Sequence, residues 1–302
     1  MGAGLHRKWA AALIGVGAVL ALAGCGSGGA GGLGSELQDN LIGNLPGRPS
    51  AAPTVELVDP VELVNMWRVS APGEDTETWL RLNGSRYDLW RPCGPIAGGW
   101  AATASGLFVA SRPFMAQAAC GIPEDIPWLT STATFARISD GWQLLDAAGA
   151  QTATLRIDGI PPAHPNVWDG ERQPPEVTHQ VRAVFTEPPP LPSNLVPPTA
   201  EQLARRWVPE GRFATQPYVQ FYLDGTYLGS DGCNGVSGAW RLAPDGRMLG
   251  TTGVQTAIGC DGVPMGAWMQ NVARVGMANN NHFNLVLLDH TGAEIGRLIA
   301  AR

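Results

Sequence analysis

An internal repeat constrains the fold of this chain more than any other feature of its sequence. When the chain is compared with itself at an offset of 140 residues, nine positions between 59 and 128 are identical. Three of these pairs are Trp and two are Cys, which are rare residue types, so chance does not explain the match. Two copies at so long a period predict tandem domains, because solenoid repeats are about 20–50 residues long. The pairs are Leu63/Leu203, Trp67/Trp207, Tyr87/Tyr227, Cys93/Cys233, Gly98/Gly238, Trp100/Trp240, Gly106/Gly246, Cys120/Cys260 and Trp128/Trp268.

The repeat places two domains on either side of a proline-rich segment. We place the first domain at 59–157, with an extension to 186 as the alternative, and the second at 199–302. The segment between them, 158–198, is rich in proline, which favours extended polyproline II and predicts a semi-rigid spacer. Within it, residues 177–185 (VTHQVRAVF) predict a strand that would add to the edge of the first domain.

Both copies open with the same local pattern. Asp59 and Thr199 are each followed three residues later by Glu or Gln, which is typical of a capping box at the start of a helix. In the short helix predicted after each cap, a Leu and a Trp lie four residues apart on one face, as Leu63 and Trp67 do in the first copy.

The rest of each copy predicts a small antiparallel sheet. Alternating apolar residues end at Asp224-Gly225, and the first copy has a matching Asn83-Gly84, both strong hairpin signals. A helix is predicted after Pro264, whereas Pro127 predicts a shorter or broken helix in the first copy. Two more strands are predicted near 282–288 and 293–300. The predicted fold class is α+β, mainly antiparallel β, with two tandem small cracked-barrel-like domains that each carry one or two short helices.

The N-terminus has the pattern of a signal peptide, predicted at 1–24. A short basic segment precedes an apolar run at 9–21, which is too short for the roughly 20 residues of a membrane-spanning helix. Residues 22–25 (LAGC) resemble a bacterial lipobox, which implies that Cys25 is acylated and becomes the first residue of the mature chain. Two acyl chains give stable anchoring. The alternatives are an ordinary secreted protein and an uncleaved anchor.

The lipobox places the protein outside the cell, anchored through Cys25 to the outer face of the cytoplasmic membrane. A tether is predicted at 25–58, and its Gly-rich beginning at 26–34 is typical of a flexible coil. The chain has a formal charge of −6 and one lysine, and removal of Arg7 and Lys8 gives 18 − 26 = −8. Nucleic acid is excluded as a partner because its backbone needs a basic surface.

The cysteines are interpreted as one lipid attachment site and two structural pairs. In an exported protein, one pair per domain at the same spacing predicts the disulfides Cys93–Cys120 and Cys233–Cys260. Zinc binding and cross-domain pairing are the alternatives, although the four cysteines lack the CxxC spacing of zinc sites.

The second copy resembles the META domain family (HslJ-type). The resemblance is carried by residues 232–240 (GCNGVSGAW) and 256–260 (TAIGC), and by the apolar segment 285–288 followed by Asp289 and Gly292. It covers most of 203–300. The first copy is divergent, because it has Gly94 in place of Asn234 and residues 115–120 (MAQAAC) in place of the Thr256 motif. The resemblance implies a small envelope lipoprotein with a cracked barrel and no established enzymatic activity.

The repeat argues against a duplicated active site. Four histidines lie beyond the signal, at 164, 179, 282 and 290, and none has a counterpart in the other copy. Asp231, Asp245, Asp261 and Asp289 fall at predicted turns, where their side chains bind local backbone. The sequence therefore predicts no catalytic, cofactor-binding or metal-ligating residue and no cofactor.

The predicted function is that of a non-catalytic, membrane-anchored binding or scaffold module for a protein or apolar ligand. Trp268, Met265 and Met269 would line a ligand groove beside the helix after Pro264, unless all three belong to the core. The alternatives are a lipid or glycolipid carrier in the envelope and a hydrolase with an unrecognised site.

Overall fold

The computed structural model describes residues 58–165, 167–253, 262–278 and 281–301, and the fold is mainly antiparallel β. The predicted signal peptide, Cys25, Thr256, Cys260 and Asp261 lie outside these residues. Within the described part of the chain, no helix has both the length and the apolar character needed to cross a membrane.

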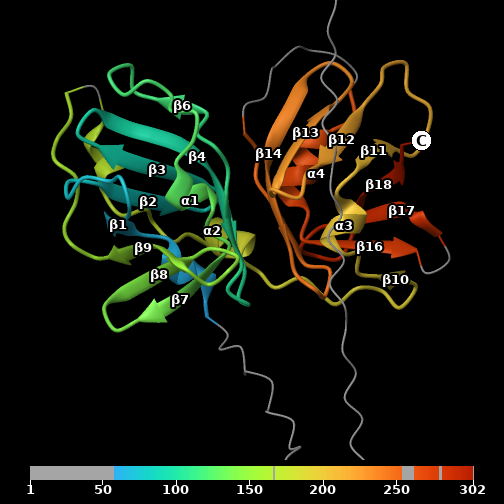
Figure 1. Ribbon diagram of the computed structural model, residues 1–302, viewed down its shortest axis with the longest axis horizontal. Helices are drawn as coiled ribbons and strands as arrows, with labels where there is room; N and C mark the ends of the chain where they lie inside the picture. The colour runs from blue at the N-terminus through green and yellow to red at the C-terminus, as the bar shows by residue number, and fades with distance from the viewer. Residues whose placement is uncertain (1–57, 166, 254–261, 279–280, 302) are drawn as a thin grey trace, which may run out of the picture. The chain divides into compact units, whose positions relative to one another are not determined.

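The first sheet contains the first copy of the repeat (Figure 1). Its strand order is β5-β4-β3-β2-β1-β9-β8-β7, and β6 pairs with β4. The 3-10 helix η1 (Pro60–Leu63) precedes it and helix α1 (Pro127–Thr130) lies between β6 and β7. The strands are β1 (Met66–Ser70), β2 (Trp79–Asn83), β3 (Arg86–Arg91), β4 (Gly94–Ala102), β5 (Phe108–Ala110), β6 (Met115–Ala116), β7 (Thr134–Ile138), β8 (Gly141–Leu145) and β9 (Gln151–Arg156).

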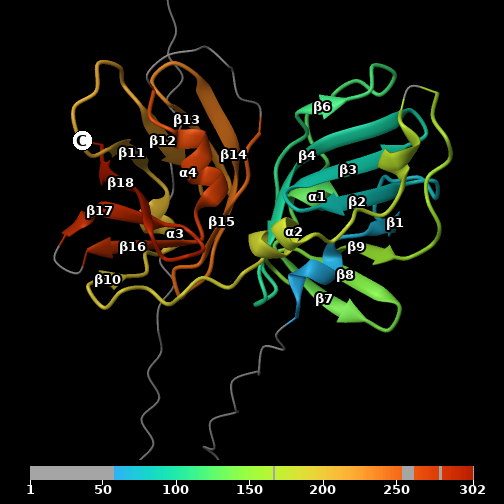
Figure 2. The same cartoon turned by 180° about the vertical axis from the view of Figure 1, so that it is seen from behind.

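The second sheet contains the second copy, and eight of its strands follow the order of the first sheet, with β10 added at one edge. Its path is β10-β16-β17-β18-β11-β12-β13-β14-β15, with helix α3 (Ala200–Leu203) before β11 and helix α4 (Met265–Asn271) before β16 (Figure 2). The strands are β10 (Leu195–Val196), β11 (Arg206–Pro209), β12 (Tyr218–Phe221), β13 (Thr226–Ser230), β14 (Gly235–Leu242), β15 (Met248–Gly250), β16 (Arg274–Ala278), β17 (Asn281–Leu288) and β18 (Glu294–Ala300).

Each sheet curls until its two ends nearly meet, which gives the cracked barrel that the sequence predicts. In the first sheet a single bridge pairs Leu107 with Thr134, and in the second Arg247 pairs with Arg274. Two backbone hydrogen bonds flank each bridge: Phe108 N to Ala133 O in the first barrel corresponds to Met248 N to Ala273 O in the second. All these positions differ by 140, so the repeat extends to how each barrel closes.

The repeated aromatic residues form the same buried contacts in both barrels. The Tyr87 hydroxyl donates to Ser111 O at 3.0 Å, and the Tyr227 hydroxyl donates to Thr251 O at 2.7 Å. Burial raises the pKa of both phenols well above the ordinary value, so both stay protonated donors. The paired glycine on the next strand is required for space: a Cβ on Gly98 would collide with the Tyr87 ring.

The Leu–Trp pair that opens each copy works differently from the prediction. Trp67 and Trp207 lie on β1 and β11, beyond the short helices, and are buried in the two cores. Their indole N–H groups donate back to Leu63 O at 2.7 Å and Leu203 O at 2.9 Å. The last carbonyls of a helix have no backbone partner within the helix. The four-residue spacing lets each Trp indole donate to one of them.

The helix caps and lengths agree with the sequence in most respects. Thr199 and Gln202 form the predicted capping box, whereas Asp59 caps only through Val61 N and begins a 3-10 helix. Helix α1 has four residues and α4 has seven, as Pro127 predicts.

The prediction of a strand at 177–185 is wrong. Residues His179–Val184 form helix α2, because the Thr178 side chain accepts from Val181 N and starts a helix. Beyond its end, Phe185 packs on Trp100 of the first core, with ring centroids 5.5 Å apart. The 3-10 helix η2 (Asp169–Arg172) precedes α2, and β10 pairs with β16 at the edge of the second sheet.

Candidate functional site: the Trp268 pocket

The second barrel has an aromatic pocket of about 450 Å³ beside helix α4. Trp268 from α4 and Phe213 from the loop between β11 and β12 supply its apolar surface. Glu210, Glu294 and Arg297 supply its polar rim. A pocket with aromatic walls and a few charged groups has the composition of a ligand site.

Helix α4 separates the three residues that the sequence grouped into a groove. Met265 and Met269 are fully buried in the second core and do not line the pocket, so their assignment to a groove is corrected. Their spacing of four residues puts both on the core-facing side of the helix. Trp268 is half-buried at the edge of that side and is the only one of the three that reaches the pocket.

Strand β18 provides the support under Trp268. The indole lies over Gly296, where an added Cβ would come within 2.8 Å of Trp268 Cδ2. The first copy has Ala153 at the position of Gly296. In the second barrel Leu287 of β17 pairs with Gly296 of β18, and in the first barrel the equivalent Leu144 of β8 pairs with Ala153 of β9. Glycine at 296 therefore lets the Trp268 ring rest directly on the strand backbone.

The rim is a solvated group of three charges. Arg297 donates from Nε to Glu294 Oε1 at 3.1 Å and from Nη2 to Glu294 Oε2 at 2.7 Å, and its Nε lies 3.5 Å from Glu210 Oε2. The hydrogen bonds that Arg297 donates to Glu294, together with the two carboxylate charges, raise the pKa of Arg297 above its ordinary value. With two carboxylates and one guanidinium, the rim carries one net negative charge.

The opposite wall is an exposed aromatic ring. Phe213 is 44% exposed, an unusual state for so apolar a side chain. Its ring lies against Gly211, whose φ of 130° suits glycine and whose missing side chain leaves the ring room. The loop therefore presents Phe213 to the pocket instead of burying it in the core.

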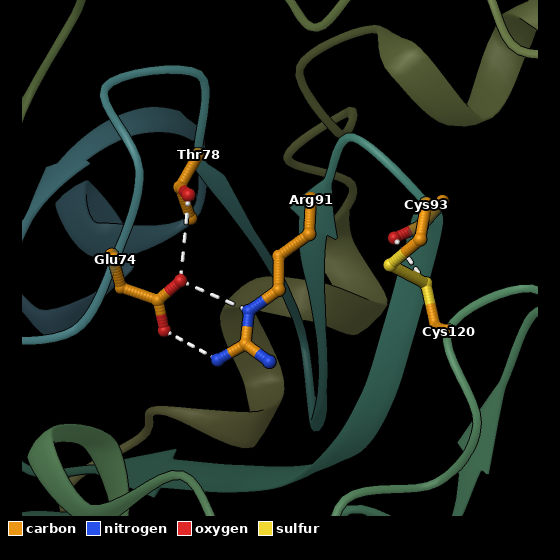
Figure 3. Close-up of a disulfide and its surroundings, with 6 residues drawn as sticks. Glu74, Thr78, Arg91, Cys93 and Cys120 are labelled. Atoms are coloured by element: carbon orange, nitrogen blue, oxygen red, sulfur yellow. Dashed lines mark hydrogen bonds and ion pairs between the residues drawn. A yellow bond between two sulfur atoms is a disulfide. The ribbon is translucent and has the colours of Figure 1, made fainter.

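The first barrel fills the corresponding place with a buried ionic group (Figure 3). The equivalent Trp128 on α1 donates its indole N–H to Glu74 Oε1 at 2.7 Å. Arg91 clamps the same carboxylate, from Nη2 to Oε1 at 2.6 Å and from Nε to Oε2 at 2.9 Å, and the Thr78 hydroxyl approaches Oε2 at 3.4 Å. The Glu74 side chain is only 2% exposed, so this Trp is closed off by a satisfied network.

The second copy keeps the Trp but lacks the residues that surround it in that network. Its loop at 210–217 has Phe213 and Ala214 near its middle, and its one carboxylate, Glu210, faces Arg297. The position of Arg91 is occupied by Asp231. Among the residues that the structure describes, no hydrogen bond involves the Trp268 indole N–H, which leaves it available to a ligand.

Asp231 is a structural residue. Its carboxylate accepts from Cys233 N at 2.7 Å and from Asn234 N at 2.5 Å, and the Asn234 amide also donates to it, at 3.0 Å. Burial opposes its ionisation, but these hydrogen bonds outweigh burial and hold the pKa of Asp231 below its ordinary value. Asp245 and Asp289 bind backbone N–H groups of their own turns, as predicted.

The first predicted disulfide is confirmed. Cys93 and Cys120 are bonded with their Cα atoms 5.0 Å apart, and Cys93 lies two residues after Arg91 (Figure 3). Cys233 is also disulfide-bonded. Its predicted partner, Cys260, lies outside the described residues, so that pairing remains a prediction.

The described residues contain no group of three or more His, Cys, Asp or Glu side chains that could hold a metal ion. No protein-family model, curated protein or solved structure matches this chain. The resemblance to the META domain family therefore stays a prediction that its motif residues carry.

Sequence reasoning missed Phe213, Glu210 and Arg297 as pocket residues, and Glu74 and Arg91 as the group that fills the first barrel. A signal for the second set was present: Arg91 aligns with Asp231, a reversal of charge two residues before the Cys93/Cys233 pair of the repeat. Identities in a repeat identify the shared core, whereas charge reversals identify where the copies differ in role.

Proposed function

We propose that this protein is a non-catalytic envelope lipoprotein, anchored through Cys25, that binds a protein or other ligand in the Trp268 pocket of its second META-like domain. One observation carries the proposal. Equivalent tryptophans are sealed by Glu74 and Arg91 in the first barrel and left open, with a free indole N–H, in the second.

The two copies would then have different roles. In the first barrel, Glu74 of the loop after β1 binds both Arg91 of β3 and Trp128 of α1, and this buried network leaves no open site beside the Trp. The first barrel would therefore serve as a structural domain. The second barrel holds its loop away from α4 and exposes two aromatic rings. Exposed aromatic residues beside polar groups are typical of binding surfaces, where they supply contact area at low entropic cost.

The rim supports binding over catalysis. Its carboxylates are exposed to solvent, and Glu294 is held in a bidentate ion pair with Arg297. Catalytic acids and bases normally lie in sites from which water is excluded. An envelope lipid carrier remains the second candidate, since the pocket walls are apolar, but the charged rim favours a ligand with a polar end.

Native mass spectrometry of residues 35–302 after incubation with an envelope extract tests the proposal. We expect a bound species that Trp268→Ala loses and that Trp168→Ala retains. Trp168 is the matched control, because it is 76% exposed and lies outside the pocket. Equal binding by both variants, or no bound species at all, would remove the pocket from the function. An acyl species would favour the carrier.

A further inference from the structure

We infer that the Trp268 pocket receives a guanidinium group, such as an arginine side chain of a partner protein. The inference rests on the proposed function and names the chemistry of its ligand. It is based on how the first barrel places its own arginines against the rings of two otherwise buried tryptophans, Trp79 and Trp142.

The first barrel builds the same arrangement twice with its own arginines. Arg68 lies 4.0 Å from the Trp79 ring centroid and pairs with Glu77 at 3.1 Å. Arg137 lies 4.4 Å from the Trp142 ring centroid and pairs with Glu62. In both cases an aromatic face and a carboxylate hold one guanidinium between them, which is the geometry that cation–π attraction and an ion pair favour together.

The Trp268 pocket has the aromatic face and the carboxylates but no arginine over the ring. Arg297 is held by Glu294, and in the described part of the chain no cation lies over Trp268 or Phe213. Arg212, next to Phe213 in the loop, does not line the pocket. The missing component of the arrangement is therefore the cation.

Charge selects the class of ligand. Glu210 is the less engaged carboxylate, since it lies 3.5 Å from Arg297 Nε while Glu294 takes both shorter contacts. Its unused lone pairs can accept from a second guanidinium, whereas an anion would meet a rim with one net negative charge. An uncharged ligand would remove the rim carboxylates from water without giving them a charged partner, which is unfavourable.

Titration of N-ethylguanidinium chloride into ¹⁵N-Trp-labelled protein tests the inference, with Trp268→Phe used to assign the Trp268 indole signal. We expect that signal to shift saturably, and equal concentrations of sodium acetate and sodium chloride to leave it in place. Glu210→Gln should weaken the apparent affinity about two- to five-fold, the range of one exposed charge contact. Trp168→Phe, which replaces an exposed tryptophan outside the pocket lining, should leave the affinity unchanged.

The outcomes separate the two proposals. A shift with cyclohexanol but not with N-ethylguanidinium would keep a binding pocket and overturn its cation preference. A guanidinium shift that Glu210→Gln does not weaken would also overturn the preference. If no probe moves the Trp268 signal and no extract component binds, the proposed function itself fails.

Discussion

Trp128 and Glu74 are joined by a 2.7 Å hydrogen bond from the indole N–H to a carboxylate that is 2% exposed. The carboxylate comes from the loop after β1 and the indole from α1, so the bond holds two distant segments together. Arg91 on β3 completes the group. The buried Glu74 carboxylate is therefore the shared hydrogen-bond acceptor that joins Trp128 and Arg91 in the first barrel.

The first prediction concerns that charge. Glu74→Ala should lower the free energy of unfolding by about 2–4 kcal/mol, because it leaves the Trp128 N–H and the half-buried Arg91 without a partner. Urea denaturation followed by circular dichroism measures the loss. Glu77→Ala is the matched control, since its pair with Arg68 is exposed and is worth less than about 1 kcal/mol. Equal effects of the two variants would contradict a buried network.

The second prediction concerns the disulfide at the end of β3. Replacing Cys93 and Cys120 by Ala should destabilise the first barrel by about 3.5 kcal/mol, because the bond closes a loop of 27 residues in the unfolded chain. Denaturation of the double variant measures the change. Peptide mapping of the wild-type protein without reduction should show a Cys93–Cys120 peptide, and a Cys233–Cys260 peptide if the second pairing is right.

The third prediction concerns the glycine beside each buried tyrosine. Gly98→Ala should cost about 1–3 kcal/mol of stability, because its Cβ would meet the Tyr87 ring in a packed core. Gly84→Ala is the control: among the described residues its Cβ would make only ordinary contacts, 3.7 Å from Val181 Cγ2, and its φ is not positive. Combining Gly98→Ala with Tyr87→Leu should cost less than the sum of the two single changes. Additive costs would show that the two residues do not share space.

The fourth prediction concerns acid sensitivity at the turn between β17 and β18. Hydrogen bonds from the Thr291 side chain, with those from the Thr291 and Ala293 backbone N–H groups, lower the pKa of Asp289 below its ordinary value of 3.8. A lowered pKa means that the stabilisation is complete above the unfolded value and is lost as the pH falls toward the folded value.

Asp289→Asn should therefore lower the melting temperature at pH 7 and have a smaller effect near pH 3. Thermal denaturation at both pH values measures the difference. Asp140→Asn is a comparison variant, because Asp140 and Arg156, its ion-pair partner, are both exposed. A constant deficit for Asp289→Asn at both pH values would show that its charge is not what stabilises the turn.

The repeat predicted that both copies share one fold before any contact was known, although it did not give the strand order. Once Tyr87, Gly98 and Trp100 aligned with residues 140 positions later, the same arrangement was expected in both copies, and eight equivalent strands follow the same order in the two sheets. Local turn chemistry at Asp224 and Pro264 then located a hairpin and a helix correctly, because these signals act over a few residues.

Other elements depended on neighbours far along the chain. Alternating residues at 177–185 fit a strand, but the Thr178 cap and the packing of Phe185 on Trp100 favoured a helix. The spacing of Met265, Trp268 and Met269 gave one helical face, but not that the two Met side chains are buried in the core or that Trp268 rests on Gly296 of β18. Phe213 carried no signal at all, since exposure of an aromatic residue results from the loop's tertiary path.

The single bridge that closes each barrel has a mechanical consequence. Every other neighbouring pair on the closed path shares a longer run of paired residues, whereas Leu107–Thr134 and Arg247–Arg274 are isolated bridges. A force pulling a barrel open would concentrate on those few hydrogen bonds, and the ring would part there first. Each barrel would then open along that one seam and widen, while the pairing between its other strands is kept.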